Sequence, residues 1–176
     1  MQSWLVPLPH EGEIVVLQSP PRELMLSLVA ALALNGPLLA LDANNQFDAY
    51  RLARLIRQRT TRLYDVLERV RVSRAFTCYQ VVALFEQLPA VAMPHVVFDL
   101  PAMFYDESVT PEESRRLLRI ALGHVRRVSR VAPVVISVRR PVAAQRVALL
   151  AAVVELADRL LTWETAEAPA QPRLFS

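Results

Sequence analysis

The sequence predicts an α/β fold with three layers, α/β/α, in which helices cover both faces of a mostly parallel central sheet. Two observations support this prediction. Short apolar runs of strand length alternate along the chain with longer segments of helical periodicity. These runs are continuous in Val, Ile and Leu, which is typical of strands buried on both faces and joined by helical crossovers.

Composition favours one soluble domain. The 176 residues are 53% hydrophobic and 21% charged, so we expect a single domain over residues 1–166 and a loose Ala/Pro-rich tail over residues 167–176. The longest apolar runs, Leu24–Leu34 and Val147–Val154, are shorter than the ~20 residues of a membrane-spanning helix, and we expect no membrane partner. The single Cys78 excludes an internal disulfide framework and is typical of the cytoplasm.

The expected elements follow from these runs. We predict strands at 13–17, 37–43, 71–76, 95–100, 132–138 and 157–164, and helices at 22–34, 48–59, 61–70, 79–88, 110–130 and 141–156. Leu174-Phe175 could add a pairing at a sheet edge.

Helix ends are marked by capping residues. Asn35-Gly36 predicts a C-cap that uses positive φ at glycine. Asp48 is an expected N-cap, and Thr60 or Thr61 is another. Thr110-Pro111-Glu112-Glu113 is a capping box with proline at the first helical position.

Ligands of parallel sheets bind beyond the carboxyl ends of the strands. In this chain those ends carry Gln18-Ser19, Asp42 to Asn44, Asp99 and Arg139-Arg140. We therefore expect any functional site to lie among these residues. The scattered His10, His95 and His124 do not predict a metal site.

Several segments together resemble the ATPase core of the RecA/RadA recombinase superfamily. They are LDANNQFDAYRLARL (41–55), RVSRAF (71–76), HVVFDLPAMF (95–104), RRLLRIALGHVRRVSRVAPVVISV (115–138) and ADRLLTWE (157–164). The resemblance covers residues 13–164 and implies a single RecA-like domain with a P-loop NTPase fold, in which Asp99 occupies the acidic Walker B position.

The phosphate loop of that family has no counterpart here. The stretch Gln18 to Met25 contains neither the glycines nor the lysine of the Walker A motif G-x-x-x-x-G-K-[ST]. Pro20 and Pro21 remove two backbone N–H donors, and Glu23 adds a negative charge. Arg22, at the start of a helix, could still contact an anion.

Other catalytic positions also depart from the family pattern. Asn44 stands where the family has a glutamate that orients the attacking water, and Val138-Arg139 stand where it has a polar pair. Asp42 and Asp99 are interpreted as strand-end carboxylates that cap a turn or pair with an arginine. We therefore predict a pseudo-ATPase with no catalytic residues, no cofactor and no metal, in which Arg22, Asp42, Asn44 and Asp99 are vestigial.

All 20 cationic residues are arginines. Arg126, Arg127, Arg139 and Arg140 are candidate contacts to DNA or to a partner protein, the last two because the family's second DNA-contacting loop follows strand five. The loop at 105–110, which matches the first, is acidic. The alternative is that the arginines form solvated faces paired with nearby acids.

The resemblance thus implies a non-catalytic accessory or interaction protein in DNA recombination or repair. Its partner would be a protein, such as a recombinase or polymerase, with weak DNA binding in addition. Two alternatives remain open at this point. One is a nucleotide-binding or ATPase subunit with an atypical or partner-completed site, and the other is a structural partner-binding domain outside DNA metabolism.

Overall fold

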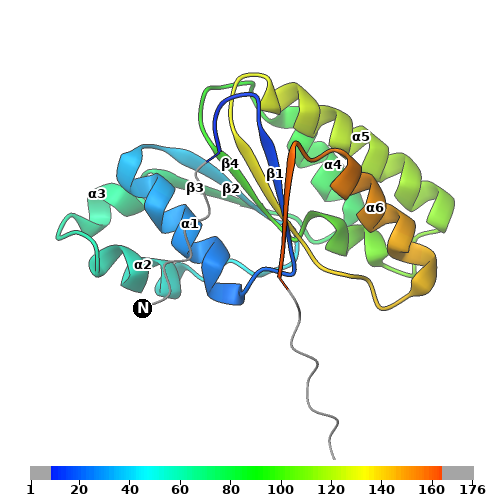
Figure 1. Cartoon of the computed structure of the whole chain (residues 1–176), viewed down its shortest axis with the longest axis horizontal. Helices are drawn as coiled ribbons and strands as arrows, with labels where there is room; N and C mark the ends of the chain where they lie inside the picture. The colour runs from blue at the N-terminus through cyan, green and yellow to red at the C-terminus, as the bar shows by residue number, and fades with distance from the viewer. Residues whose placement is uncertain (1–8, 164–176) are drawn as a thin grey trace, which may run out of the picture.

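The structure is a computed structural model that describes residues 9–163 (Figure 1). The strands are β1 (Ile14–Gln18), β2 (Leu38–Asp42), β3 (Val70–Arg74), β4 (His95–Phe98), β5 (Val134–Val138) and β6 (Arg159–Thr162). The α-helices are α1 (Arg22–Asn35), α2 (Ala49–Arg57), α3 (Leu63–Leu67), α4 (Cys78–Gln87), α5 (Pro111–Ser129) and α6 (Val147–Glu155). Two short 3₁₀ helices are η1 (Leu100–Tyr105) and η2 (Ala144–Arg146). The predicted alternation of strands and helices is confirmed.

The strands form one sheet in the order β3-β2-β4-β5-β1-β6, and every pair in it is parallel. The strands β2 and β4 are neighbours in the sheet, and the connections that follow them run in opposite directions along it. From β2 it continues to β3 at one edge, whereas from β4 it continues to β5 and the other half of the sheet. Such a reversal leaves a crevice beyond the carboxyl ends of the two strands, where open parallel sheets bind ligands.

Helices pack on both faces of the sheet (Figure 1). A hydrophobic core lies on each face of the sheet, and the side chains of β1 point alternately into the two cores. Val15 and Leu17 pack with α1, α2 and α3, while Ile14 and Val16 pack with α4, α5 and α6. This alternation is the two-residue period of a strand buried on both sides. Among the described residues, none of the helices combines the length and apolarity needed to cross a bilayer.

Two of the predicted helix starts are confirmed by their hydrogen bonds. The Asp48 side chain accepts from the Arg51 N–H at 3.0 Å. The Thr110 hydroxyl accepts from the Glu113 N–H at 3.3 Å, with Pro111 at the first helical position of α5. Local sequence signals therefore determine where α2 and α5 begin.

Other local predictions are wrong wholly or in part. Helix α1 ends at the predicted pair, with Gly36 as its C-cap, but the φ of Gly36 is 168°, which is extended and not left-handed. Helix α3 begins after Arg62 without a side-chain cap, because Thr60 lies two residues before the cap position and its hydroxyl accepts from the Arg62 N–H. The helix predicted at 141–156 begins at Val147 instead, since the chain from Arg139 to Ala143 is a loop. The tail and the predicted edge pairing of Leu174-Phe175 lie outside the described residues.

Candidate functional site

Three residues expected at the site come together at the carboxyl ends of β2, β4 and β5. The Asn44 Nδ2 donates to the Asp99 Oδ2 at 2.8 Å, which ties the loop after β2 to the end of β4. Arg139 follows β5 directly. With Tyr105 and Arg140 these side chains line an open cavity of about 360 Å³.

Asp42 is a structural carboxylate, as its position at a strand end predicted. It is 1% exposed. Its Oδ1 accepts from the Gln46 N–H at 2.8 Å, and its Oδ2 accepts from the Phe47 N–H at 3.1 Å. The Arg74 guanidinium lies 3.3 Å from the same Oδ2. Asp42 therefore caps the turn after β2 and pairs with an arginine, which leaves it no spare capacity for a ligand.

Asp99 has different surroundings. It is 3% exposed, and its backbone adopts a left-handed conformation with φ of 49°. Its N–H donates to the Ser137 hydroxyl at 2.9 Å, which anchors the residue to β5. Among the described residues, the Oδ1 has no hydrogen-bond partner of good geometry. A buried carboxylate oxygen left in this state, on a strained backbone, is typical of functional sites and has a cost in stability.

The electrostatics of the site follow from burial. Desolvation raises the pKa of the Asp99 carboxyl, and this effect is only partly offset by the Asn44 hydrogen bond and by the charge and backbone N–H of Arg139. Burial also raises the pKa of the Tyr105 hydroxyl, and the nearby Asp99 charge acts in the same direction. In both groups burial thus makes the charged form less favourable than it is in an exposed side chain.

The connection from β1 to α1 offers few backbone donors to a ligand. The Ser19 N–H donates to the Val138 carbonyl at 2.9 Å. Pro20 and Pro21 have no N–H to donate. Arg22 is exposed and lines, with both prolines and Asp99, a small cavity of about 20 Å³. That volume suits an ordered water.

The loops after η1 and β5 lie side by side. The Tyr105 hydroxyl donates to the Arg139 carbonyl at 2.9 Å. Arg139 and Arg140 are exposed, and Val142 beyond them projects fully into solvent. The structure therefore presents Arg139 and Arg140 at the rim of the cavity, where they are free to contact a large partner.

Arg146 holds these loops together, and sequence reasoning missed it. It is 1% exposed. Its guanidinium donates to the Ser114 hydroxyl at 2.8 Å and to the carbonyls of Asp106 and Val109 at 2.9 and 2.6 Å. No local signal distinguishes this arginine from the exposed ones, because its acceptors lie more than thirty residues away. Its burial also accounts for the late start of α6, since η2 turns Arg146 inward.

Arg126 and Arg127 have intramolecular roles. Arg126 donates to the Leu156 carbonyl at 2.8 Å and lies 3.4 Å from the Asp158 carboxylate. Arg127 donates to the Phe85 and Leu88 carbonyls at 3.1 and 3.0 Å, and so caps the end of α4. Both side chains are half-buried on α5, and their guanidinium groups hold neighbouring elements in place.

The described residues contain no group of three His, Cys, Asp or Glu side chains placed to hold a metal ion. Cys78 is buried, and burial raises the pKa of its thiol. His95 lies at the amino end of β4, away from the site, where burial lowers its pKa to about 4.

No protein-family model matches this chain, and a search of curated proteins found no match.

Proposed function

We propose that this protein is a non-catalytic accessory protein with a degenerate RecA-like domain, and that it acts in DNA recombination or repair by binding a protein partner and, weakly, DNA. The RecA/RadA resemblance supports the assignment to DNA metabolism. The arrangement at the carboxyl ends of the strands supports the absence of catalysis.

The observation that carries the proposal is the β1–α1 connection. A phosphate loop binds through successive backbone N–H groups and a lysine. Here the Ser19 N–H is already donated to Val138, the next two residues are prolines, and the adjoining cavity measures about 20 Å³. Asp99 keeps its acidic position, but the first turn of α1, from Arg22 to Met25, contains no serine or threonine hydroxyl with which it could share a magnesium ion.

Isothermal titration calorimetry with ATP and Mg²⁺ tests this reading. We expect no binding in the micromolar range and no phosphate release over long incubation. Micromolar binding that is lost in Asp99→Asn would overturn the non-catalytic assignment and establish a nucleotide site.

DNA binding is tested separately, by retention of single-stranded and duplex DNA across a salt series. Arg139 and Arg140 are the expected contacts, because they are exposed at the rim of the cavity. We expect weak binding that falls with salt, and its loss in the double variant Arg139→Glu/Arg140→Glu. Arg119→Glu, an exposed position on α5, is the matched control and should bind as the parent does. If the parent protein retains no DNA, either alone or with a recombinase, the assignment to DNA repair is wrong.

A second candidate function is a nucleotide-binding subunit whose site is completed by a partner. One observation favours it: within residues 9–163, the Asp99 Oδ1 has no hydrogen-bond partner of good geometry, although the residue is buried at the switch point of the sheet. The same calorimetry, repeated with a co-purified partner, distinguishes this function from the first.

A further inference from the structure

We propose that the groove between α1 and α2 is a docking site for an acidic, amphipathic helical segment of a partner protein. The groove has a volume of about 240 Å³ and shares no lining residue with the two carboxyl-end cavities described above. Its walls are Glu23 and Leu26 from α1, and Arg51, Arg54, Leu55 and Gln58 from α2.

The spacing of the lining residues creates a continuous row on each helix. Arg51, Arg54, Leu55 and Gln58 stand at positions i, i+3, i+4 and i+7, which share one face of a helix. Glu23 and Leu26 stand three residues apart on α1. In each row an apolar side chain lies among polar ones. Two adjacent helices with such rows form the kind of groove into which an amphipathic helix lays its apolar face.

The groove, at about 240 Å³, is smaller than a typical small-molecule site. Small-molecule sites have volumes of about 300–1,000 Å³ and are more enclosed. Leu26 is buried and Leu55 is half-buried, so they form an apolar floor that can take a few partner side chains. The Arg59 guanidinium donates to the Ser27 carbonyl at 3.2 Å and holds the end of α2 against α1, so the groove is formed before a partner arrives.

The charge around the groove is the argument for an acidic occupant. Arg51 lies 3.4 Å from the Asp48 carboxylate, whereas Arg54 and Arg57 form no ion pair with any described residue. The groove itself is lined by two arginines, Arg51 and Arg54, and by one carboxylate, Glu23. Complementary charge of this kind steers and orients an acidic partner.

A peptide fits this surface better than a nucleic acid does. A phosphate backbone is uniformly negative, so Glu23 in the groove wall repels it, and it has no use for the floor of Leu26 and Leu55. A peptide instead carries separate charges. It can place carboxylates beside Arg51 and Arg54, an apolar side chain on the floor, and a neutral or basic residue beside Glu23.

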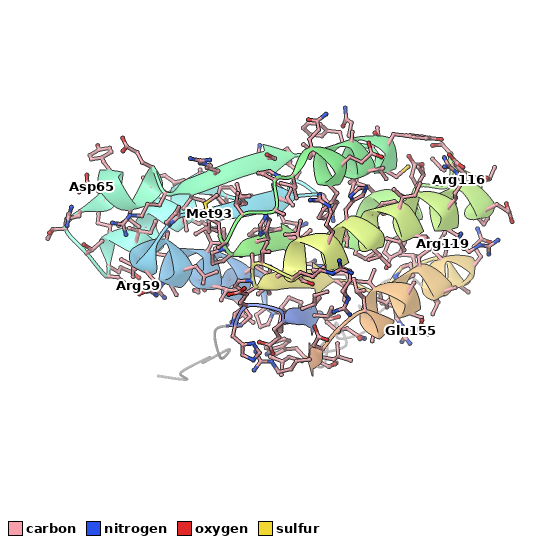
Figure 2. All side chains as sticks on the ribbon, turned by 90° about the horizontal axis from the view of Figure 1, so that it is seen from above. Arg59, Asp65, Met93, Arg116, Arg119 and Glu155 are labelled. Carbon is pink, nitrogen blue, oxygen red and sulfur yellow. The ribbon has the colours of Figure 1, made fainter. Side chains whose placement is uncertain are left out.

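The experiment uses a displayed peptide library selected on the full chain, with counter-selection on a variant whose groove is filled and reversed in charge, Arg54→Glu/Gln58→Trp. Both positions are exposed, so this variant should fold, and circular dichroism and thermal unfolding verify that it does. Arg119→Glu is the matched control for charge, because Arg119 lies at the opposite end of the molecule from Arg59 (Figure 2). Recovered peptides are synthesised and their affinities measured by fluorescence anisotropy, beside a short DNA duplex.

We expect recovered peptides in which Asp and Glu flank apolar residues at helical spacing. Their affinity should fall by about tenfold or more in Arg54→Glu/Gln58→Trp, remain unchanged in Arg119→Glu, and rise modestly in Glu23→Gln. Peptides of basic or random composition, or equal affinity for parent and variant, overturn the proposal. Loss of duplex binding in the groove variant also overturns it, in favour of a nucleic-acid surface. The outcome is independent of the nucleotide and DNA tests on Asp99, Arg139 and Arg140, so either proposal can fail alone.

Discussion

Asp42 and Asp99 end neighbouring strands of the same sheet and are almost equally removed from solvent, at 1% and 3% exposure. Their surroundings nevertheless differ. Backbone N–H groups and Arg74 satisfy both oxygens of Asp42. Asp99 receives one side-chain hydrogen bond, from Asn44, and has a left-handed backbone. The first carboxylate stabilises the turn that follows it, while the second is held in place by its neighbours despite a cost in stability.

The difference shows which part of the carboxyl edge can take part in function. A buried polar group that is fully paired contributes to stability and has little left for a ligand. A buried carboxylate with an unused oxygen is kept in spite of its desolvation, and such groups concentrate at functional sites. The half of the edge around Asp42 is therefore scaffold, and the half formed by Asp99, Tyr105 and the Arg139 loop is the place to look for a partner.

The largest expected effect comes from Asp42→Ala. The substitution leaves the N–H groups of Gln46 and Phe47 and the Arg74 guanidinium without their acceptor. We expect it to lower the free energy of unfolding by about 3 kcal/mol. Urea unfolding measures this change. Asp48→Ala, which removes an exposed helix cap, is the control and should cost about 1 kcal/mol. If both variants lose the same amount, Asp42 is no more than a surface cap and the contrast with Asp99 fails.

The next largest effect is a pH dependence of the free energy of unfolding, and it arises from His95, at the other end of β4 from Asp99. Its pKa is about 4 in the folded protein against 6.5 when exposed, so the unfolded chain binds the proton first as the pH falls. The stabilisation is complete above the unfolded pKa and is lost as the pH falls towards 4. Between about pH 7.5 and about pH 5 this group should remove about 2 kcal/mol of stability.

His95→Leu removes this titration and is the means of measuring it. Urea unfolding at several pH values should give a shallower decline for the variant over the same range. An identical decline in parent and variant would show that other groups carry the acid sensitivity. It would also mean that burial at an end of β4 does not by itself disfavour the charged form of a side chain. The same burial could then not be the cause of the raised pKa of Asp99.

The parts of this structure that could be predicted are those determined locally. Pro20-Pro21, the capping box at Thr110 and the apolar strands act through adjacent residues, so their effects were readable in the sequence. Arg146 could not be distinguished from the exposed arginines, because its burial depends on acceptors in a distant loop.

Contacts between distant parts of the chain also determine the roles of the residues predicted for the site. In the sequence Arg126 and Arg127 resemble a basic surface, yet their hydrogen-bond acceptors belong to the ends of α4 and α6. Asp99 was identified by its position at a strand end. Its left-handed backbone and its unused oxygen arise only when β4 and β5 are paired and Ser137 accepts its N–H.

The smallest expected effect is that of Asp99→Asn. It distinguishes the two carboxylates best, because this substitution should stabilise the protein whereas Asp42→Ala should destabilise it. Burial raises the pKa of Asp99, so its ionised form destabilises the folded protein at pH values above that pKa. Asp99→Asn removes the charge, retains an oxygen for the Asn44 amide, and introduces the residue that best tolerates a left-handed backbone after glycine. We expect the melting temperature at neutral pH to rise by a few degrees, with the gain disappearing in acid as the parent becomes protonated. A stabilised variant that also loses partner binding would identify Asp99 as a group kept for function. If the variant is destabilised instead, Asp99 is a structural carboxylate, as Asp42 is.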